Sequence, residues 1–578
     1  MRSGRARAFA SAVVAGLLGA APGSGLAQQT AIYSDRDLVH PVYGQSGMVA
    51  TQEETATRIG LEVLQNGGNA VDAAATVAFV LAVTLPRAGN LGGGGFMVVH
   101  DAASGETVAI DYREKSGANA FRDMFLDEAG EADPEKSRYS GLAVGVPGTV
   151  AGMALALERY GTISLAEALE PALELAGRGI AVTPDLADSL NDSKERLQRW
   201  PSSAAIFYKD GGVPYEPGEI LVQRDLASSL RLIAEQGQGA FYGGPIGEKI
   251  VAAVRRAGGH LSLDDFRGYE AVVRAPVQGD YRGYQIVSMP PPSSGGVHIV
   301  QILNILEGYP IGFLGAGGAE TIHLMAEAMK LAYADRSEYL GDPDFVEVPV
   351  AALTTKAYAE HLRASISRNR ARLAESIKPG DLAPYESSET THFSIVDAAG
   401  NAVANTYTIN FSYGTGLVAE GTGILLNNEL DDFSAKPGVP NAYGLIGGDA
   451  NAVQPSKRPL SSMSPTIVLQ DGKPFLVTGS PGGSRIITTT LQIIMNVIDH
   501  GMNIAEATHA PRIHHQWLPD ELRIEEGLSP DTIALLEQKG HAIAVGAAMG
   551  STQSIMVTED GLFGSSDPRT PGALTLGY

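Results

Sequence analysis

The sequence predicts an α+β fold in which two stacked antiparallel sheets lie between layers of helices. Runs with the two-residue alternation of half-buried strands form hairpins at 96–113, 390–409 and 466–478. Apolar helices flank them, and the segment 70–83 is apolar nearly all round, as is typical of a helix buried between layers. Hairpins that alternate with such helices favour a sandwich of two sheets covered by helices on both faces.

The bulk composition describes a large globular chain and excludes several classes of function. The 578 residues are 44% hydrophobic and 19% charged, with a formal net charge of −23. Such an acidic balance argues against nucleic acid and anionic membrane surfaces as partners. The chain has no cysteine, which excludes disulfides, thiolate catalysis and cysteine metal sites.

The N-terminus has the pattern of a secretory signal peptide. Three arginines precede an apolar run, 9–21, that is too short to span a bilayer, and small residues at positions 25 and 27 suit a cleavage site after Ala27. We therefore expect a signal peptide over 1–27 and a periplasmic or secreted protein. A short anchor or a disordered tail is the alternative interpretation. The other apolar run, 73–86, is short and ends at a proline, which favours a buried helix.

The N-terminal part begins with two expected helices and a glycine run. Thr51 is the expected N-cap of a helix that ends at Gln65, and the buried helix 70–83 follows. The glycines of 90–96 lack the Lys-Ser/Thr of a phosphate loop, so they predict a turn where backbones approach closely.

The middle of the chain is predicted to be mainly helical, with one hairpin. A helix follows 144–149 and ends near Tyr160, and Ser262 caps a short helix whose first turn holds Asp264 and Asp265. Pro290–Gly296 is expected to form a bend. The other expected elements are helices over 166–176, 188–198, 225–235, 247–257 and 319–334, and a hairpin over 279–288.

The segment 363–388 is polar and rich in arginine, proline, glycine and serine, which predicts a loop. Directly after it, Thr390 begins a strand that turns at 397–401 and returns over 402–409. A helix is expected over 486–499, after the hairpin 466–478.

The chemistry of Thr390 depends on whether the chain is cut before it. A side-chain hydroxyl needs a base beside it, and an N-terminal threonine carries one in its α-amine, with an ordinary pKa of about 7.7–8.0. An internal threonine has no such group. Alone, the pair Thr390-Thr391 is an ordinary strand start. Thr408 and Asn410 lie on the return strand, within reach of Thr390 in a hairpin, although exposed strand polar residues are the common interpretation of such a pair.

Longer motifs decide between these interpretations. The run 390–434, together with PLSSMSP at 459–465 and GSPGGS at 479–484, closely resembles the γ-glutamyltranspeptidases (glutathione hydrolases), and the resemblance covers most of the chain. This family belongs to the N-terminal nucleophile hydrolases. The resemblance implies an αββα fold and self-cleavage before Thr390. It also implies a heterodimer of a large subunit, 28–389, and a small subunit, 390–578. We expect no cofactor and no metal.

The resemblance also assigns roles at the site. Thr390 is implied as the nucleophile, Thr408 orients its hydroxyl, and Tyr443 belongs to a lid loop over 437–448. The backbone N–H groups of Gly482 and Gly483, at a strand-to-helix turn, are suited to an oxyanion, which is also their implied role. The residues implied to hold the charged head of a γ-glutamyl group are Arg113, Ser461 and Ser462 for its carboxylate, and Glu429, Asp432 and Asn410 for its ammonium.

For several of these residues a purely structural role or a metal site is an alternative interpretation. Arg113 at a strand end is usually a solvated charge or a salt-bridge partner, and a glycine-rich run such as 437–448 is usually a surface loop. The acidic segment 427–433 suggests a calcium loop but lacks the EF-hand spacing. His514-His515 suggests a metal, but no third ligand is placed with the pair.

Three functions are weighed. The first is a γ-glutamyltransferase and glutathione hydrolase that passes the γ-glutamyl group to water or to an amino acid or peptide. The second is a cephalosporin acylase of the same fold, against which Arg113, Asp432 and the lid argue. The third is a secreted, non-catalytic binding protein that is never cleaved.

Overall fold

The computed structural model describes residues 39–377, 390–436, 438–439 and 444–578. The expected signal peptide, the residue before Thr390 and the lid residue Tyr443 lie outside the described residues. A search of the described part for a helix long and apolar enough to cross a membrane finds none.

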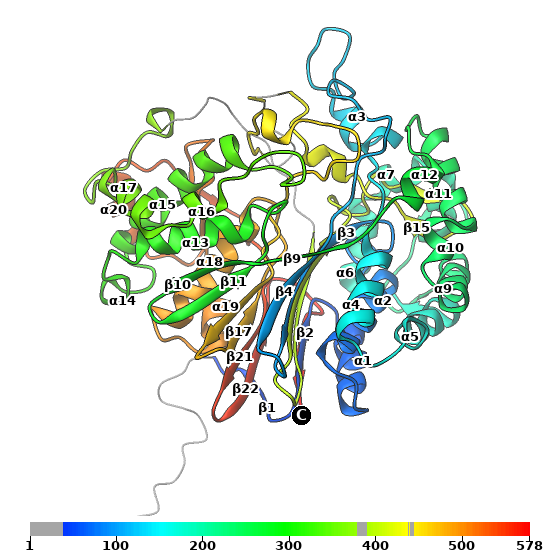
Figure 1. The fold of residues 1–578 in the computed structure, drawn as a ribbon, viewed down its shortest axis with the longest axis horizontal. Helices are drawn as coiled ribbons and strands as arrows, with labels where there is room; N and C mark the ends of the chain where they lie inside the picture. Colours follow the sequence, from blue (N-terminus) through cyan, green and yellow to red (C-terminus); the bar gives the residue numbers. More distant parts are fainter. Residues whose placement is uncertain (1–38, 378–389, 437, 440–443) are drawn as a thin grey trace, which may run out of the picture. The chain divides into compact units, whose positions relative to one another are not determined.

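Two large antiparallel sheets form the centre of the molecule, as predicted (Figure 1). Each has seven strands within the described residues. The first sheet has the order β1 (Val42–Gly44), β22 (Gly561–Ser566), β21 (Gln553–Thr558), β17 (Lys473–Thr478), β16 (Thr466–Gln470), β11 (Tyr284–Ser288) and β10 (Val277–Tyr281). The second has the order β23 (Leu574–Gly577), β2 (Met48–Thr51), β12 (Thr391–Val396), β13 (Ala402–Thr408), β3 (Gly94–Asp101), β4 (Glu106–Tyr112) and β9 (Val272–Arg274).

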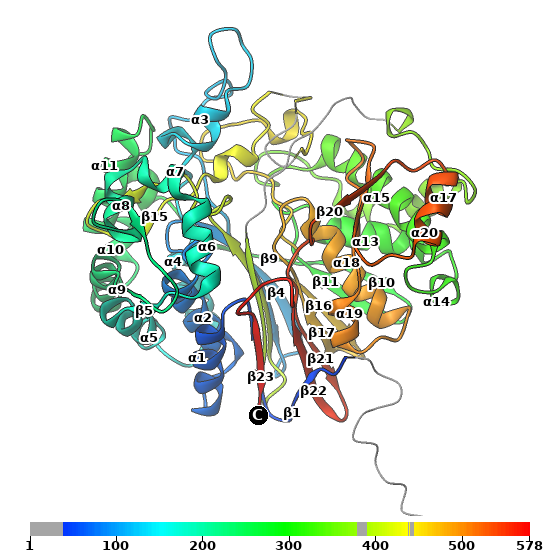
Figure 2. The same cartoon turned by 180° about the vertical axis from the view of Figure 1, so that it is seen from behind.

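Helices cover the outer face of each sheet, so the molecule has four layers, which are seen edge-on in Figures 1 and 2. The layer beside the second sheet contains α1 (Glu54–Gln65), α2 (Ala70–Thr84), α4 (Thr149–Tyr160), α5 (Leu165–Arg178), α9 (Arg224–Gln236) and α11 (Pro245–Arg256). The layer beside the first sheet contains α13 (Gly295–Leu306), α15 (Ala319–Tyr339), α17 (Lys356–Ala364), α18 (Arg485–Ile498), α19 (Ile504–His509) and α20 (Pro530–Gln538).

Three apolar clusters hold the four layers together. One lies between each helical layer and its sheet, and the third lies between the two sheets, where Val98 of β3 and Val287 of β11 meet. Burial of apolar surface contributes roughly 25 cal/mol for each Å², so these contacts dominate the stabilisation of the sandwich.

The alternation along β12 decides which way the strand directs its side chains. Phe393 and Ile395 belong to the cluster between the second sheet and its helical layer, whereas Val396 belongs to the cluster between the sheets. Because successive side chains of a strand point to opposite faces, Thr390 and His392 share the inter-sheet face with Val396. The polar positions of β12 therefore face the interior and not solvent.

The predicted close approach at the glycine run is confirmed at Gly92 and Gly93. A Cβ atom at Gly92 would lie 2.0 Å from the carbonyl oxygen of Leu425, and one at Gly93 would lie 2.1 Å from that of Thr408. Contacts this short exclude any side chain. The run therefore lets the chain that follows β13 pack against β3.

Most predicted elements are confirmed within a few residues: the three hairpins of the sheets, the hairpin β10–β11, and the helices α2, α4, α5, α9, α11 and α18. The capping box of Ser262 with Asp265 is also confirmed, at α12 (Leu263–Arg267).

Two predictions of helix boundaries are wrong. Thr51 ends strand β2, and Glu53 caps α1 through its carboxylate. The helix expected over 188–198 is two helices, α6 (Pro184–Asp192), which Thr183 caps, and α7 (Lys194–Gln198). Helix α13 is not predicted from the sequence, because all of its residues are buried and show no amphipathic period.

Both sheets contain strands from either side of Thr390. In the second sheet, β12 and β13 lie between β2 and β3, and in the first sheet β16 lies between β11 and β17. The segments before and after Thr390 are therefore interleaved through backbone hydrogen bonds.

Candidate active site

Thr390 directly precedes β12, lies between the two sheets and is 5% exposed. Its Oγ1 donates to Oγ1 of Thr408 at 3.5 Å. The pairing of Thr391 with Tyr407 in the β12–β13 ladder brings these two hydroxyls face to face. The sequence predicted this contact from the hairpin alone.

Thr408 and Asn410 are buried, so the interpretation of exposed strand residues is wrong. The Thr408 hydroxyl accepts from the backbone N–H of Asn410 at 2.8 Å, and the Asn410 amide donates to the carbonyl of Asn428 at 2.9 Å. Asn410 has a φ of 72°, a left-handed conformation in which asparagine is enriched. These bonds connect the end of β13 to the acidic segment.

His392 shares the inter-sheet face with Thr390 and is the histidine nearest to it in sequence. Its ring nitrogens lie 2.8 Å from the hydroxyl of Thr406 and 3.1 Å from that of Ser394. Burial lowers the pKa of His392 to about 3. Both nitrogens are thus occupied, which leaves the imidazole in a structural role.

A cavity opens at Thr390 and gathers most of the predicted site residues; we call it the head cavity. With Thr390 and Thr408 it is lined by Arg113, Asn410, Glu429, Asp432, Ser461, Ser462 and Gly483. These residues come from separate parts of the chain and meet beside one hydroxyl. The cavity has about 310 Å³ of empty volume, which includes space open to solvent.

Arg113 is fully buried in this cavity and pairs with two carboxylates. Its Nη1 donates to Glu429 and its Nη2 donates to Asp432. A third carboxylate, that of Glu114, lies 3.8 Å from Nη1. The guanidinium also donates through Nε to the carbonyl of Pro459 at 3.2 Å. The interpretation of a solvated strand-end charge is therefore wrong for Arg113.

Burial and mutual repulsion disfavour the charged forms of these acids. Burial raises the pKa of Glu429 to about 7, although Arg113 acts in the opposite direction. Burial also raises the pKa of Asp432, and burial together with Glu429 raises that of Glu114 well above its usual range. Arg113 opposes these shifts, because a guanidinium beside the carboxylates favours their charged forms.

Arg336, on α15, is a lining residue that the sequence analysis missed. Its Nε donates to the Ser294 hydroxyl at 2.9 Å, and its Nη2 donates to the Ser462 hydroxyl at 3.2 Å. Burial lowers its pKa to about 10, so it stays charged at neutral pH. The sequence predicts that this helix ends at 334, whereas α15 continues to Tyr339, so Arg336 lies just beyond the predicted helix and carries no motif that could have marked it.

Gly482 and Gly483 form the turn between β17 and α18. Both have left-handed backbones, with φ of 133° and 56°, which favour glycine. Gly483 lines the head cavity, and Gly482 lines an adjoining cavity that also reaches Thr390. The turn thus passes directly beside the threonine, where backbone N–H groups suit a developing oxyanion.

The loop 437–448 is described in part. Leu445 from its C-terminal end lines the head cavity and is buried. The loop therefore contributes to the site, which overturns the interpretation of a plain surface loop for this part of it.

Two sequence patterns that suggested metals have other partners. Asp431 of the acidic segment accepts from the Ser137 hydroxyl at 2.5 Å and pairs with Arg138. His514 bonds to Thr488 and Gln516, and His515 pairs with Asp520.

A different buried group in the described part has the ligand types of a metal site. It consists of His323, Glu327 and His541, whose ligand atoms lie within 4.8 Å of one another. The two imidazoles contact each other at 2.8 Å, and Lys330 pairs with Glu327 at 2.9 Å. The ammonium of Lys330 supplies the positive charge next to this carboxylate.

The four-layer sandwich, with a buried threonine at the start of a central strand and an oxyanion-type turn beside it, defines the class of N-terminal nucleophile hydrolases. The family model for gamma-glutamyltranspeptidase matches residues 56–576. The glutathione hydrolase proenzyme of Escherichia coli (strain K12) is 59% identical over 546 residues, which is 94% of each chain. This chain belongs to the γ-glutamyltranspeptidase family.

Solved structures agree with the class. The cephalosporin acylase from Bacillus halodurans superposes with a TM-score of 0.82 at 28% identity, over 95% of this chain and 98% of that chain. A chain of the gamma-glutamyltranspeptidase of Helicobacter pylori gives a TM-score of 0.55 at 46% identity, over 56% of this chain and 93% of that chain.

The buried ion pairs of Arg113 predict a strong effect on stability. Replacing Arg113 by Met leaves Glu429 and Asp432 buried without their guanidinium, and breaking a buried pair in this way typically costs about 3–5 kcal/mol. We expect a lower melting temperature at pH 8. The deficit should shrink at pH 5, because protonation neutralises the stranded carboxylates, whose pKa values burial already raises. Calorimetry at both pH values measures this.

Arg58→Met is the matched control, because it breaks an exposed pair with Glu54. Such pairs contribute little, so its melting temperature should equal that of the wild type. If Arg113→Met melts like this control at pH 8, the carboxylates do not depend on Arg113.

Proposed function

We propose that this protein is a γ-glutamyltransferase and glutathione hydrolase that cleaves the γ-glutamyl amide of glutathione and related compounds. The observation that carries the proposal is the head cavity, which places a guanidinium and two carboxylates beside the hydroxyl of Thr390. The α-carbon of a γ-glutamyl group carries one ammonium and one carboxylate. The cavity offers a counter-charge for each.

The charges of the cavity suit a head group with no net charge. Arg113 and Arg336 supply two positive charges, and Glu429 and Asp432 supply up to two negative ones. Binding exchanges ion pairs: the ligand carboxylate takes Arg113, with the hydroxyls of Ser461 and Ser462, and the ligand ammonium takes Glu429 and Asp432. A ligand without the ammonium would leave these buried carboxylates unpaired, which is costly.

The nucleophile requires a free α-amine on Thr390. We propose that the chain cuts itself before this residue, which yields a large piece, 28–389, and a small piece, 390–578. The amine then accepts the proton of the Thr390 hydroxyl, and Thr408 orients that hydroxyl through the contact at 3.5 Å.

The reaction proceeds in two steps. Oγ1 of Thr390 attacks the γ-carbonyl carbon, and the carbonyl oxygen gains negative charge, which the N–H groups of Gly482 and Gly483 stabilise. The C–N bond breaks, the leaving amine takes the proton from the Thr390 ammonium, and a γ-glutamyl ester remains. Water, or the amine of an amino acid or peptide, then attacks the ester and regenerates the threonine.

The interleaved strands support a stable pair of pieces after the cut. The hairpin of β12 and β13 is flanked by strands from before Thr390: β12 is hydrogen-bonded to β2, and β13 is hydrogen-bonded to β3. We infer that the large and small pieces stay together as a heterodimer. The N-terminal pattern supports export to the periplasm or beyond the cell, and we propose that Tyr443 belongs to a lid over the head cavity.

An acylase of the same fold is the second candidate, because the acylase from Bacillus halodurans superposes well. Acylases of the glutaryl type act on a side chain that lacks the α-ammonium. Glu429 and Asp432 beside Arg113 have no role toward such a group, so the geometry favours the γ-glutamyl substrate.

Thr390→Ala is expected to remain one chain, because the cut uses the same hydroxyl. Denaturing electrophoresis should show two bands for the wild type and one for the variant, whose activity should fall by at least about 1,000-fold. Thr391→Ala is the control: its buried hydroxyl has no hydrogen-bond partner among the described residues, so it should still be cut. A processed Thr390→Ala protein, or an active wild type that runs as one band, would contradict the mechanism. A wild type that runs as one band and is inactive would support a non-catalytic binding protein.

Substrate choice tests the head cavity. We expect hydrolysis of a γ-glutamyl anilide with kcat/KM at least about 100-fold above those of the matching α-glutamyl and glutaryl anilides, because only the γ-glutamyl group presents both charges correctly. Initial-rate kinetics on the three anilides measure this. Equal rates on the glutaryl compound would identify an acylase instead.

The raised pKa of Glu429 predicts the shape of the acid limb of the pH profile. Glu429 must be ionised to bind the ammonium, and it takes up a proton as the pH falls through about 7. The Thr390 amine must be neutral and protonates in the same range. Log kcat/KM should therefore approach a slope of 2 below about pH 6, and a slope of 1 in Glu429→Gln. The exposed residue Glu128 gives the control Glu128→Gln, which should keep the wild-type slope. Equal slopes in the wild type and Glu429→Gln would show that Glu429 does not titrate in the binding step.

A further inference from the structure

A second cavity, separate from the acidic head cavity, also reaches Thr390. It has about 690 Å³ of empty volume and shares only Thr390 with the head cavity among their lining residues. Its other lining residues include Gln52, Arg87, Gly482, Arg485 and Arg569. We call it the arginine cavity.

The oxyanion-type turn separates the two cavities. Gly483 lines the head cavity and Gly482 lines the arginine cavity, so consecutive residues of the turn border different cavities. An amide whose carbonyl carbon meets Oγ1 of Thr390 has its acyl part on one side and its nitrogen substituent on the other. With the γ-glutamyl group in the head cavity, the leaving group extends into the arginine cavity.

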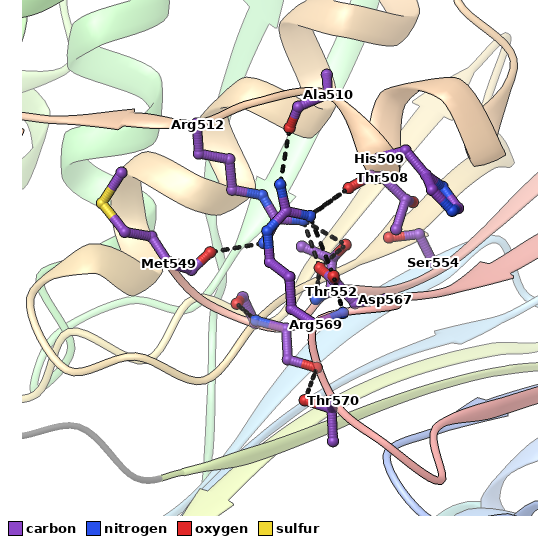
Figure 3. A network of polar contacts seen from close by, with 12 residues as sticks. Thr508, His509, Ala510, Arg512, Met549, Thr552, Ser554, Asp567, Arg569 and Thr570 are labelled. Atoms are coloured by element: carbon purple, nitrogen blue, oxygen red, sulfur yellow. Dashed lines mark hydrogen bonds and ion pairs between the residues drawn. The ribbon is translucent and has the colours of Figure 1, made fainter. Parts of the chain in front are cut away.

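Two of the three arginines of this cavity already have carboxylate partners. Arg87 pairs with Asp185. Arg569 donates to Glu525 at 2.6 Å and to Asp567 at 3.1 Å. Figure 3 shows Arg569 and the neighbouring Arg512 converging on Asp567.

These pairs are balanced in charge. Arg569 and Arg512 face Glu525 and Asp567, and Arg569 is held further by the carbonyls of Thr508 and Ala510, both at 3.0 Å (Figure 3). Arg87 and Asp185 cancel each other. None of these groups leaves a net charge in the cavity.

Arg485 is different. It is the first residue of α18, directly after the turn of Gly482 and Gly483. Among the described residues its guanidinium forms no ion pair or hydrogen bond, and its Nε is buried without a partner. His514, which interacts electrostatically with Arg485, is neutral because burial lowers the pKa of its imidazole to about 3. As far as the described segments go, the arginine cavity therefore holds one positive charge that no carboxylate compensates.

We propose that Arg485 binds the carboxylate of the leaving group and of the incoming acceptor. The ligands are amines that carry a carboxylate: the dipeptide released from glutathione, and the amino acid or peptide that accepts the γ-glutamyl group. A planar guanidinium binds a carboxylate bidentately. The inference rests on the proposed function, since it concerns the other half of the same substrate.

The test compares glutathione with its C-terminal amide as substrates of the processed protein. The two present the same γ-glutamyl amide to Thr390, so damage to the nucleophile or the head cavity cancels in the ratio of their kcat/KM values. The wild type should prefer glutathione by about 10-fold to 100-fold, the range for hydrogen bonds between charged groups. Arg485→Gln should reduce this preference to less than about threefold, and Arg485→Lys should retain part of it.

Transfer to glycylglycine and to glycylglycinamide, with a γ-glutamyl anilide as donor, tests the acceptor in the same way. Arg58→Gln removes an exposed arginine on α1 and should keep both preferences.

The outcomes separate the two proposals. A wild type that cleaves neither glutathione nor the amide contradicts the proposed function. A wild type that cleaves both without preference, or Arg485 variants that keep the full preference, contradict the role of Arg485 and leave the proposed function standing. If Arg485→Gln does not fold or is not processed, the ratio of kcat/KM for glutathione and its amide, measured in the wild type and in Arg485→Lys, still tests the role of Arg485.

Discussion

The antiparallel pairing of β12 with β13 is the constraint on which the site depends. Both strands lie in the middle of the second sheet, covered by helices on one face and by the first sheet on the other. A slip of one residue would move Phe393 and Ile395 out of the helical layer and turn Thr390 away from the space between the sheets. The apolar alternation of β12 thus fixes the register, and the register places Thr390 against Thr408.

Around this pair, the structure collects charges that the interior would otherwise reject. Arg113 is fully buried, and so is Glu429 apart from 1% of its surface. Such groups persist inside a protein only when each has a partner. Here the partners are one another, and their contacts match those that a zwitterionic head group would make. A site that holds its own ion pairs before binding is preorganised for a ligand that replaces them.

The turn of Gly482 and Gly483 gives the site two sides. On one side the charges balance, so the head cavity suits a group without net charge. On the other side the charges of the buried ion pairs also balance, and the charge of Arg485 is additional to them. The division follows from the tight turn between β17 and α18, which only residues with left-handed backbones can make.

The sequence by itself determined the layered fold, the hairpin that begins at Thr390 and the motif residues of the site. These features depend on local patterns: strand alternation, turn residues and contiguous motifs. It wrongly assigned the N-cap of α1 to Thr51, because the nearby carboxylate of Glu53 can cap the same helix. It missed α13, because a fully buried helix has no polar face.

Only the tertiary structure decided that Arg336 lines the head cavity. It also decided that Arg485 has no carboxylate partner within the described part of the chain, while Arg87 and Arg569 do. A sequence contains the number of charges but not their distances. Whether a buried arginine is compensated depends on which distant segments fold against it, and this is a property of the packing alone.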